Sequence, residues 1–171
     1  MYIPGLDRRE SDIEHSYSLA MTAWFLAPHF PELDAGHLIK LALAHDVIEI
    51  QAGDTFVYGA QEHIDSKDER ERTALAQLQK DWPDFPEMTA AVKEYADKSS
   101  EEAKFVYALD KILPPMMHYL GNGRVWQEHG VTKERFVALH EKRIAKDSLI
   151  YPYYQEILAF FQDKPHLFKQ S

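Results

Sequence analysis

The sequence predicts an all-helical fold, in which residues 1–171 form a single helical bundle. Apolar residues recur at spacings of three and four positions along most of the chain, which is the period of an amphipathic helix. Strand-length runs of alternating apolar and polar residues are absent, and no hairpin turn signal joins two such runs. The chain shows no repeat and no linker, and its 45% apolar content is enough for one buried core.

The first helix is expected to end near Pro28, because proline is poorly tolerated inside a helix. His15 lies within it. Its apolar residues define a face that we expect to turn toward the core. The residues of this face are Ile13, Tyr17, Ala20, Met21, Trp24 and Phe25.

A second helix is expected between Asp34, a suitable N-cap, and Gly53, a residue type that commonly ends helices. Most of its circumference is apolar, so it should be buried. Residues 61–82 are rich in charges of alternating sign. This pattern is typical of a helix with a solvated face.

A short helix is expected over residues 88–98. Ser99 or Ser100, followed by acidic residues, should cap the next helix. The Pro114-Pro115 pair is expected to end or kink that helix at about residue 113.

The last third of the chain predicts two more helices. Residues 121–123, Gly-Asn-Gly, are a clear turn signal. Thr132 is a suitable N-cap for a helix that runs through residue 144. Residues 151–161 form the final, aromatic-rich helix.

The charge balance is acidic, with 19 Lys and Arg against 28 Asp and Glu and a net charge of −9, so no binding of duplex nucleic acid is expected. The absence of Cys excludes disulfides, thiolate metal sites and Cys nucleophiles. No apolar run approaches the roughly 20 residues that cross a bilayer. The start of the chain lacks a signal-peptide pattern, so we expect a cytoplasmic protein without membrane contact.

Three ionisable residues, His45, Asp46 and Glu49, interrupt the second, largely apolar helix. On a continuous helix His45 and Glu49 would share one face. Burial of such charges costs several kcal/mol unless something compensates them, and a divalent cation would do so. Taken alone, a helical His is more typical of a hydrogen-bonded core residue, so both interpretations stay open.

Three further residues are candidates for the same site. Asp54 follows the end of the second helix and, by itself, is typical of a turn. Asp110 lies among apolar residues, and its alternative role is an ion pair with Lys111 or Arg124. His15, considered alone, is typical of a structural residue.

In chain order, four motifs together resemble the signature of the HD-domain metal-dependent phosphohydrolases. The motifs are Arg-Arg-Glu-Ser-Asp-Ile-Glu-His-Ser at residues 8–16, His-Asp-Val-Ile-Glu at 45–49, Gly-Asp-Thr-Phe at 53–56 and Leu-Asp-Lys at 109–111. Only their combination is specific. Within that superfamily the chain is most similar to the 5′-deoxynucleotidases and their relatives, from about residue 8 to the region of residue 151.

This resemblance implies one HD domain that holds one divalent ion. It also implies that Glu49 and Asp54 form an acidic catalytic pair, which acts on water or on the leaving group. A mixed set of imidazole and carboxylate ligands suits Mn²⁺, Co²⁺, Fe²⁺, Ni²⁺ or Zn²⁺ better than Mg²⁺. The implied metal ligands are His15, His45, Asp46 and Asp110.

The nucleotidase branch carries an additional N-terminal helix with an Arg-Trp pair that contacts phosphate and sugar. In this chain the equivalent position would precede Met1, so this first helix is expected to be missing. Arg8 and Arg9 are then the nearest guanidinium donors for phosphate. Thr55 and Lys67 are further candidate substrate contacts.

The leading functional hypothesis is a metal-dependent phosphomonoesterase that acts on nucleoside 5′-monophosphates or similar small phosphates. A phosphodiesterase or a pyrophosphohydrolase is an alternative, because the same scaffold hosts those activities. A non-catalytic helical binding module that retains a metal site is a third. The resemblance alone also implies a homodimer.

Overall fold

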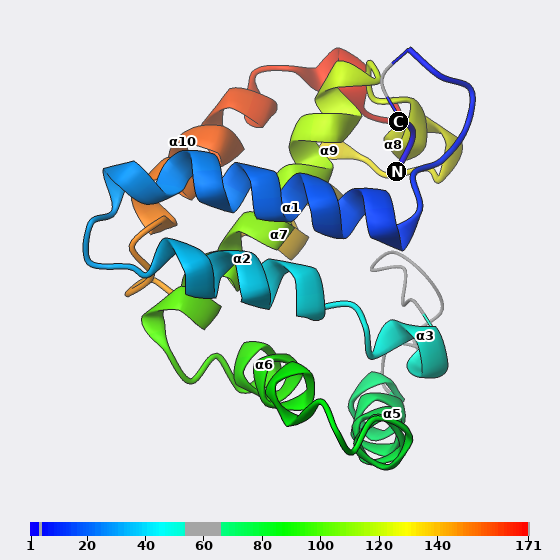
Figure 1. The fold of residues 1–171 in the computed structure, drawn as a ribbon. Coiled ribbons are helices and arrows are strands. Elements are labelled where there is room, and N and C mark those ends of the chain that lie inside the picture. Colours follow the sequence, from blue (N-terminus) through cyan, green and yellow to red (C-terminus); the bar gives the residue numbers. More distant parts are fainter. Residues whose placement is uncertain (4, 54–65, 171) are drawn as a thin grey trace. The chain divides into compact units, whose positions relative to one another are not determined.

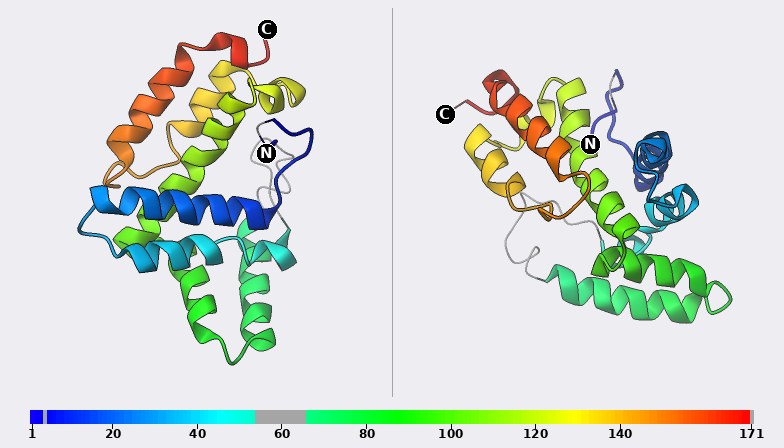
Figure 2. Two further views of the ribbon diagram at one scale, coloured as in Figure 1. Left: turned by 45° about the horizontal axis from the view of Figure 1, so that its top comes forward. Right: turned by 90° about the vertical axis from the view of Figure 1, so that its left-hand side faces the viewer.

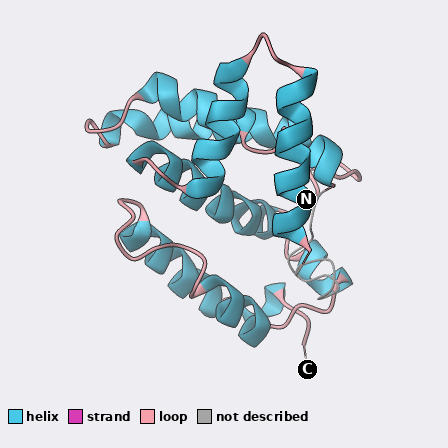
Figure 3. Ribbon diagram, turned by 90° about the horizontal axis from the view of Figure 1, so that it is seen from below, coloured by secondary structure: helices cyan, strands magenta, loops and turns pink. Residues whose placement is uncertain are grey.

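The computed structural model of this chain describes residues 1–3, 5–53 and 66–170. Within these ranges no residue belongs to a strand, and most residues are helical (Figures 1 and 3). An isolated bridge joins Tyr2 and Arg9. The predicted all-helical fold is therefore confirmed. Among the described residues, no helix combines the length and apolar character needed to span a bilayer.

The chain forms two compact units. The boundary between them falls within two helices, the first helix of the chain and the longest of the described helices. One unit is His15–Val106, and the other combines Met1–Glu14 with Tyr107–Ser171. The helical elements are α1 (Asp12–Leu26), η1 (Ala27–His29), α2 (Ala35–Ala44), α3 (Glu49–Ala52), α5 (Lys67–Asp81), α6 (Pro86–Asp97), α7 (Glu101–Leu120), α8 (Arg124–Glu128), α9 (Lys133–His140), α10 (Tyr151–Gln162) and η2 (Pro165–Leu167).

Side-chain caps explain where three of these helices begin. Asp34, Ser100 and Thr132 each accept a hydrogen bond from a backbone N–H in the first turn of the helix that follows. Such a bond satisfies one of the amide donors that a helix N-terminus leaves open. The predictions of Asp34 and Thr132 as caps are confirmed, and of the two serines proposed for α7 it is Ser100 that caps.

In the unit His15–Val106, α5 and α6 lie side by side as a helical hairpin (Figure 2). α3 packs on α5, and α2 packs on α6. Only a few residues of the highly charged α5 are buried in this core. Ile48, in the segment between α2 and α3, is buried with them and anchors that segment. The core residues are Ala44, Ile48, Ala74, Leu78 and Val92.

The other unit is built around aromatic residues from α8, α9, α10 and the C-terminal segment. Trp126 stacks on Phe168 at a centroid distance of 4.7 Å and meets Phe136 edge-on at 5.1 Å. Phe161 lies edge-on to both Trp126 and Phe136. Edge-on and offset pairs are the arrangements that aromatic rings prefer, and all four of these rings are buried.

The predicted core face of α1 is wrong. Of its six residues only Ala20 is buried, and the actual core face consists of Leu19, Ala20 and Ala23. The spacing of three and four holds for both faces, so periodicity identifies the helix without deciding which side turns inward. The larger apolar residues of α1 are left on its exposed side.

The second helix was expected to be continuous to Gly53, but it ends at Ala44 and resumes only as the short α3. His45 contributes to the break, because its side chain bonds the carbonyl of Ala42 and competes with the helical backbone bond. Tighter i to i−3 bonds follow, such as Val47 N–H to Ala44 O. The inference that His45 and Glu49 share one helix face is therefore wrong.

Of the two outcomes expected at Pro114 and Pro115, an end of the helix is wrong, since α7 continues through both prolines to Leu120. The φ angle of proline suits a helix. The cost of proline inside a helix is the missing hydrogen bond from its nitrogen and the steric contact of its ring with the preceding turn. Burial of Ile112 and Pro115 on this stretch offsets that loss.

The predicted turn at residues 121–123 contains a glycine that no other residue can replace without strain. Gly123 has φ +73°, and a Cβ atom there would lie 2.0 Å from the carbonyl oxygen of Leu167. We expect Gly123→Ala to lower the free energy of unfolding by about 3 kcal/mol or more. Gly130→Ala is the matched control, because Gly130 has φ +63° but nothing within 4 Å of its Cβ position. Urea denaturation measures both variants, and equal losses of unfolding free energy in Gly123→Ala and Gly130→Ala would contradict this account.

Candidate metal centre

His45 is buried at the C-terminal end of α2, with a side chain that is 0% exposed. Its Nδ1 lies 2.8 Å from the carbonyl oxygen of Ala42. A carbonyl only accepts hydrogen bonds, so Nδ1 carries the proton and, in the neutral ring, the lone pair is on Nε2. Tyr95 of α6 packs edge-on against the ring at a centroid distance of 5.2 Å. The tautomer and the orientation of His45 are thus set for a ligand bond through Nε2.

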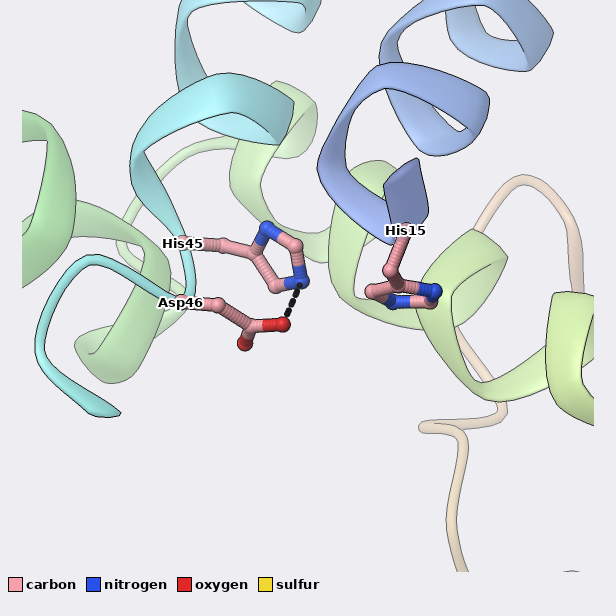
Figure 4. Close-up of side chains that lie close together, drawn as sticks. All are labelled: His15, His45 and Asp46. Atoms are coloured by element: carbon pink, nitrogen blue, oxygen red, sulfur yellow. Dashed lines mark ion pairs between the residues drawn. The ribbon is translucent and has the colours of Figure 1, made fainter. Parts of the chain in front are cut away.

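Nε2 of His45 belongs to a cluster of three potential ligand groups (Figure 4). Oδ2 of Asp46 lies 3.0 Å from Nε2. The ring of His15, which comes from α1, has its centroid 5.4 Å from that of His45. One ligand atom from each residue lies within 4.8 Å of the others. Two segments that are thirty positions apart in the sequence therefore meet at one point.

The chemistry of this donor set fits a divalent cation. A lone pair on His45 Nε2 and an ionised Asp46 oxygen at 3.0 Å repel each other unless a proton or a cation lies between them. Imidazole nitrogen with carboxylate oxygen is a ligand combination used for Mn²⁺, Co²⁺, Fe²⁺, Ni²⁺ and Zn²⁺. Three protein ligands also leave coordination positions for water and substrate.

The start of α1, directly before His15, is held by a capping box. Ser11 Oγ accepts from the N–H of Glu14 at 3.3 Å, and the Glu14 carboxylate accepts from the N–H of Ser11 at 2.9 Å. Arg8 adds two hydrogen bonds to the same carboxylate, at 2.6 and 2.9 Å. The Arg8 side chain, followed by the Ser11 amide, holds the pKa of Glu14 at about 2. The ion pair between Arg8 and Glu14 at the start of α1 therefore stays charged over the whole neutral pH range.

A polar contact also ties α2 to α6, the helix that carries Tyr95. His37 Nε2 lies 2.8 Å from Glu94 Oε1, and Ser100 Oγ donates to the same oxygen. Burial acts to raise the pKa of Glu94, but the hydrogen bonds from Ser100 and His37 outweigh it and the pKa lies below its ordinary value. This contact helps to keep α6, and with it Tyr95, packed against His45.

Glu49, the predicted catalytic acid, begins α3 and is mostly buried. Lys67 of α5 lies with Nζ 3.9 Å from Glu49 Oε1 and 3.1 Å from Glu71 Oε1. Arg70, one turn along α5, donates to the carbonyl oxygens of Ala52 and Gly53 at the end of α3. Charged residues of α5 therefore hold both ends of the short helix that carries Glu49.

The remaining predicted site residues are placed as follows. Arg8 is paired with Glu14, and the guanidinium of Arg9 lies 3.4 Å from Nε2 of His129. Asp110 is buried on α7 and forms an ion pair with Lys111, as its alternative role predicted. Asp54 and Thr55 lie outside the described residues.

Two residues at this centre escaped the sequence analysis. Tyr95 packs on His45 from a helix fifty positions away, and Arg70 bonds the end of α3. Both are common residue types on helices of ordinary periodicity, so nothing in their local sequence signals these contacts. Only the packing of α6 on α2 and of α5 on α3 brings them to the site.

Comparison with known proteins supports a single family. The family model described as HD domain matches residues 3–149, which reach into both units of the structure. A crystal structure of a predicted metal-dependent phosphohydrolase from Magnetospirillum magnetotacticum MS-1 superposes with a TM-score of 0.78 and is 32% identical in sequence. The match covers 96% of this chain and 83% of that protein.

Two curated relatives carry the name 5′-deoxynucleotidase HDDC2. The protein from Mus musculus is 33% identical over 111 residues, which is 63% of this chain and 53% of the relative. The protein from Homo sapiens is 32% identical over 111 residues, 63% of this chain and 52% of the relative. The chain thus spans about half the length of the curated relatives it matches.

Proposed function

Because the chain belongs to the HD domain family of metal-dependent phosphohydrolases, we propose that it hydrolyses the phosphate ester of nucleoside 5′-monophosphates or closely similar small phosphates. The observation that carries the proposal is the convergence of His15, His45 and Asp46 with ligand atoms within 4.8 Å of one another. The names of the curated relatives favour the nucleotide substrate. The motif order adds Asp110 as a fourth ligand.

The bound ion would lower the pKa of a coordinated water toward about 7 and would supply positive charge for the phosphoryl group. His15 and His45 provide neutral nitrogen donors, so the two carboxylates of the proposed set balance the charge of a divalent ion without making the site negative. Glu49 would hold a proton of the attacking water or deliver one to the departing 5′-oxygen. Asp54 would perform the other of these two steps.

Binding of the substrate phosphate calls for positive side chains. Lys67 lies beside Glu49 and forms ion pairs with both Glu49 and Glu71. We propose that its ammonium group contacts the phosphate and keeps Glu49 in place. Arg8, Arg9 and Thr55 are further proposed contacts, and for Arg8 this role requires its pair with Glu14 to open.

Phosphate release tests the proposal. Purified protein is loaded with Mn²⁺, Co²⁺, Ni²⁺, Fe²⁺ or Zn²⁺ in turn and given ribo- and deoxyribonucleoside monophosphates, a cyclic nucleotide and a nucleoside triphosphate. The proposal expects metal-dependent release of inorganic phosphate from monophosphates and its loss after chelation. Turnover of the cyclic nucleotide alone, or of the triphosphate alone with release of pyrophosphate, would instead support a diesterase or a pyrophosphohydrolase.

Glu49→Gln tests the role of the carboxylate without removing its volume. We expect kcat to fall by about 10²- to 10⁴-fold, the usual contribution of a general acid or base, while KM and metal content stay close to those of the parent protein. Glu71→Gln is the matched control, because Glu71 contacts the same Lys67 from α5. Its kcat should change by less than about threefold. Similar losses in both variants would assign Glu49 a role in charge balance only.

A further inference from the structure

α3, the helix that carries Glu49, is a single turn of four residues, Glu49–Ala52. Isolated helices shorter than about 12 residues are marginal in water, so a turn of this length keeps its shape only through contacts with other elements. The proposed reaction needs the Glu49 carboxylate within hydrogen-bond reach of the attacking water or of the departing oxygen. The contacts that fix α3 therefore decide where this carboxylate lies.

Arg70 of α5 bonds the C-terminal end of this turn. Its Nη1 atom donates to the carbonyl oxygen of Ala52 and, at 3.3 Å, to that of Gly53. The last carbonyls of a helix have no partner within the helix, and charge-assisted bonds such as those from a guanidinium are about twice as strong as neutral ones. Nε of Arg70 donates to Ser66 Oγ at 3.4 Å, so the guanidinium is itself held on α5.

The peptide group between Ala52 and Gly53 connects Arg70 to Glu49. Its carbonyl oxygen accepts from Arg70, and its N–H donates to the carbonyl oxygen of Glu49 at 2.8 Å. A peptide group is planar and rigid, so fixing its C=O also fixes the direction of its N–H. Two hydrogen bonds and one rigid unit therefore lead from the guanidinium to the backbone of Glu49.

The N-terminal end of the turn is held by apolar packing instead. Ile48, directly before Glu49, is buried in one core with Ala74 and Leu78 of α5. The Glu49 side chain beside it is only 14% exposed. Because several apolar side chains anchor this end, a change at Arg70 acts on the other end of α3 and leaves the core in place.

We propose that Arg70 is a positioning residue for the hydrolysis: it fixes the Ala52–Gly53 peptide group and thereby sets where the Glu49 carboxylate lies. The inference rests on the proposed function, because it concerns the step assigned to Glu49. In this role Arg70 needs no contact with the ion or the phosphate, so its loss slows the chemical step without weakening binding. A displacement of about 1 Å at a catalytic group costs roughly 10²-fold in rate.

Steady-state kinetics of Arg70→Gln test the proposal, since glutamine removes the charge and shortens the side chain. We expect kcat for the nucleoside monophosphate to fall by about 10- to 100-fold. KM and the dissociation constant of Mn²⁺ should stay within about threefold of the parent values. Arg72→Gln is the matched control, because Arg72 lies on the same helix, is 72% exposed and pairs with Glu69 at 3.0 Å. Its kcat should change by less than about threefold.

Two kinetic results would overturn the proposal. A rise in KM with kcat unchanged would make Arg70 a substrate contact, and parent values of both constants would show that its bonds do not matter for the reaction. Arg70→Lys serves the same measurements if the glutamine variant does not fold. Lysine keeps the charge but offers one compact ammonium in place of the guanidinium, so we expect the same pattern with a smaller loss of kcat.

A double-mutant cycle shows whether Arg70 acts through Glu49. The Glu49→Gln variant has already lost the carboxylate that Arg70 is proposed to place. Adding Arg70→Gln to it should therefore lower kcat by less than about threefold further. If the two losses multiply instead, Arg70 acts on another part of the site and the proposal is overturned.

Hydrogen exchange tests the contact without relying on activity. The amide of Gly53, which donates to Glu49, should exchange at least about tenfold faster in Arg70→Gln than in Arg72→Gln, because opening of α3 no longer breaks the bonds to Arg70. Exchange at the parent rate in Arg70→Gln would overturn the proposal. A parent protein that releases phosphate from no substrate would overturn the proposed function, and exchange at Gly53 would then still decide whether Arg70 fixes α3.

Discussion

Replacement of His45 by Gln is expected to abolish stoichiometric binding of a divalent ion and to lower phosphate release by at least about 10³-fold. His45 offers Nε2 to the cluster because Nδ1 is committed to the carbonyl of Ala42. Gln keeps a donor for that carbonyl but supplies no comparable nitrogen ligand. The ion's electrostatic effect on phosphoryl transfer is worth several kcal/mol, which corresponds to the stated loss of rate.

Metal analysis separates this effect from unfolding. Elemental analysis of the parent protein should give about one divalent ion per chain, as one cluster of three ligands implies. Addition of Mn²⁺ should raise the Tm of the parent protein and leave that of His45→Gln unchanged. His37→Gln is the matched control, since His37 bonds Glu94 and lies outside the cluster. Full metal content in His45→Gln would exclude His45 as a ligand.

Acidification from pH 7 to pH 5 is expected to lower the free energy of unfolding by about 4 kcal/mol through two histidines, a large part of a typical total. Burial, with a smaller contribution from nearby positive groups, lowers the pKa of His118 and of His140 from 6.5 to about 3. The native state therefore keeps both rings neutral where the unfolded chain protonates them. The contribution of the two neutral rings to the free energy of unfolding is complete above pH 6.5. Below that pH it falls by about 1.4 kcal/mol per pH unit for each ring, down to about pH 3.

The environment of each ring explains why it resists protonation. His140 is buried, and its Nδ1 lies 3.0 Å from the hydroxyl of Tyr154, which donates its own proton to the His140 carbonyl. His118 packs edge-on against Trp126, and its Nδ1 is buried without a hydrogen-bond partner among the described atoms. Neither ring has a carboxylate among the groups that shift its pKa.

Urea denaturation of the parent protein at pH 7 and pH 5 measures the expected loss. His140→Gln and His118→Phe should each remove about 2 kcal/mol of the difference between the two pH values. The exposed His166 provides the control, because His166→Gln should leave the difference unchanged. A double variant as acid-sensitive as the parent protein would show that other groups control the loss.

Local signals in the sequence predicted the features that depend on neighbouring residues. Asp34 and Thr132 cap the helices they were expected to cap, and residues 121–123 form the predicted turn. A capping hydrogen bond closes within one helical turn, so the residue type and its position are sufficient to foresee it.

Features that depend on distant residues could not be foreseen in the same way. The Leu19 side of α1 turns inward although the side with Trp24 is equally apolar. α7 passes through Pro114 and Pro115, where the side chains of Ile112 and Pro115 are buried. In both cases the free energy of packing against other elements overrides the preference of the local sequence. A local sequence pattern cannot reveal this packing energy, because it depends on residues elsewhere in the chain.

The amino-acid sequence by itself determined the helical class and the caps that begin several helices, and the resemblance of its motifs supplied the proposed residues of the metal centre. The tertiary structure alone decided that His15 meets His45 and Asp46, that the helix breaks after Ala44, and that the side of α1 with Trp24 is exposed. Spacing along the chain specifies local hydrogen bonds and helical faces. Which helix faces meet depends on packing between segments far apart in sequence, and these packing contacts exist only in the folded chain.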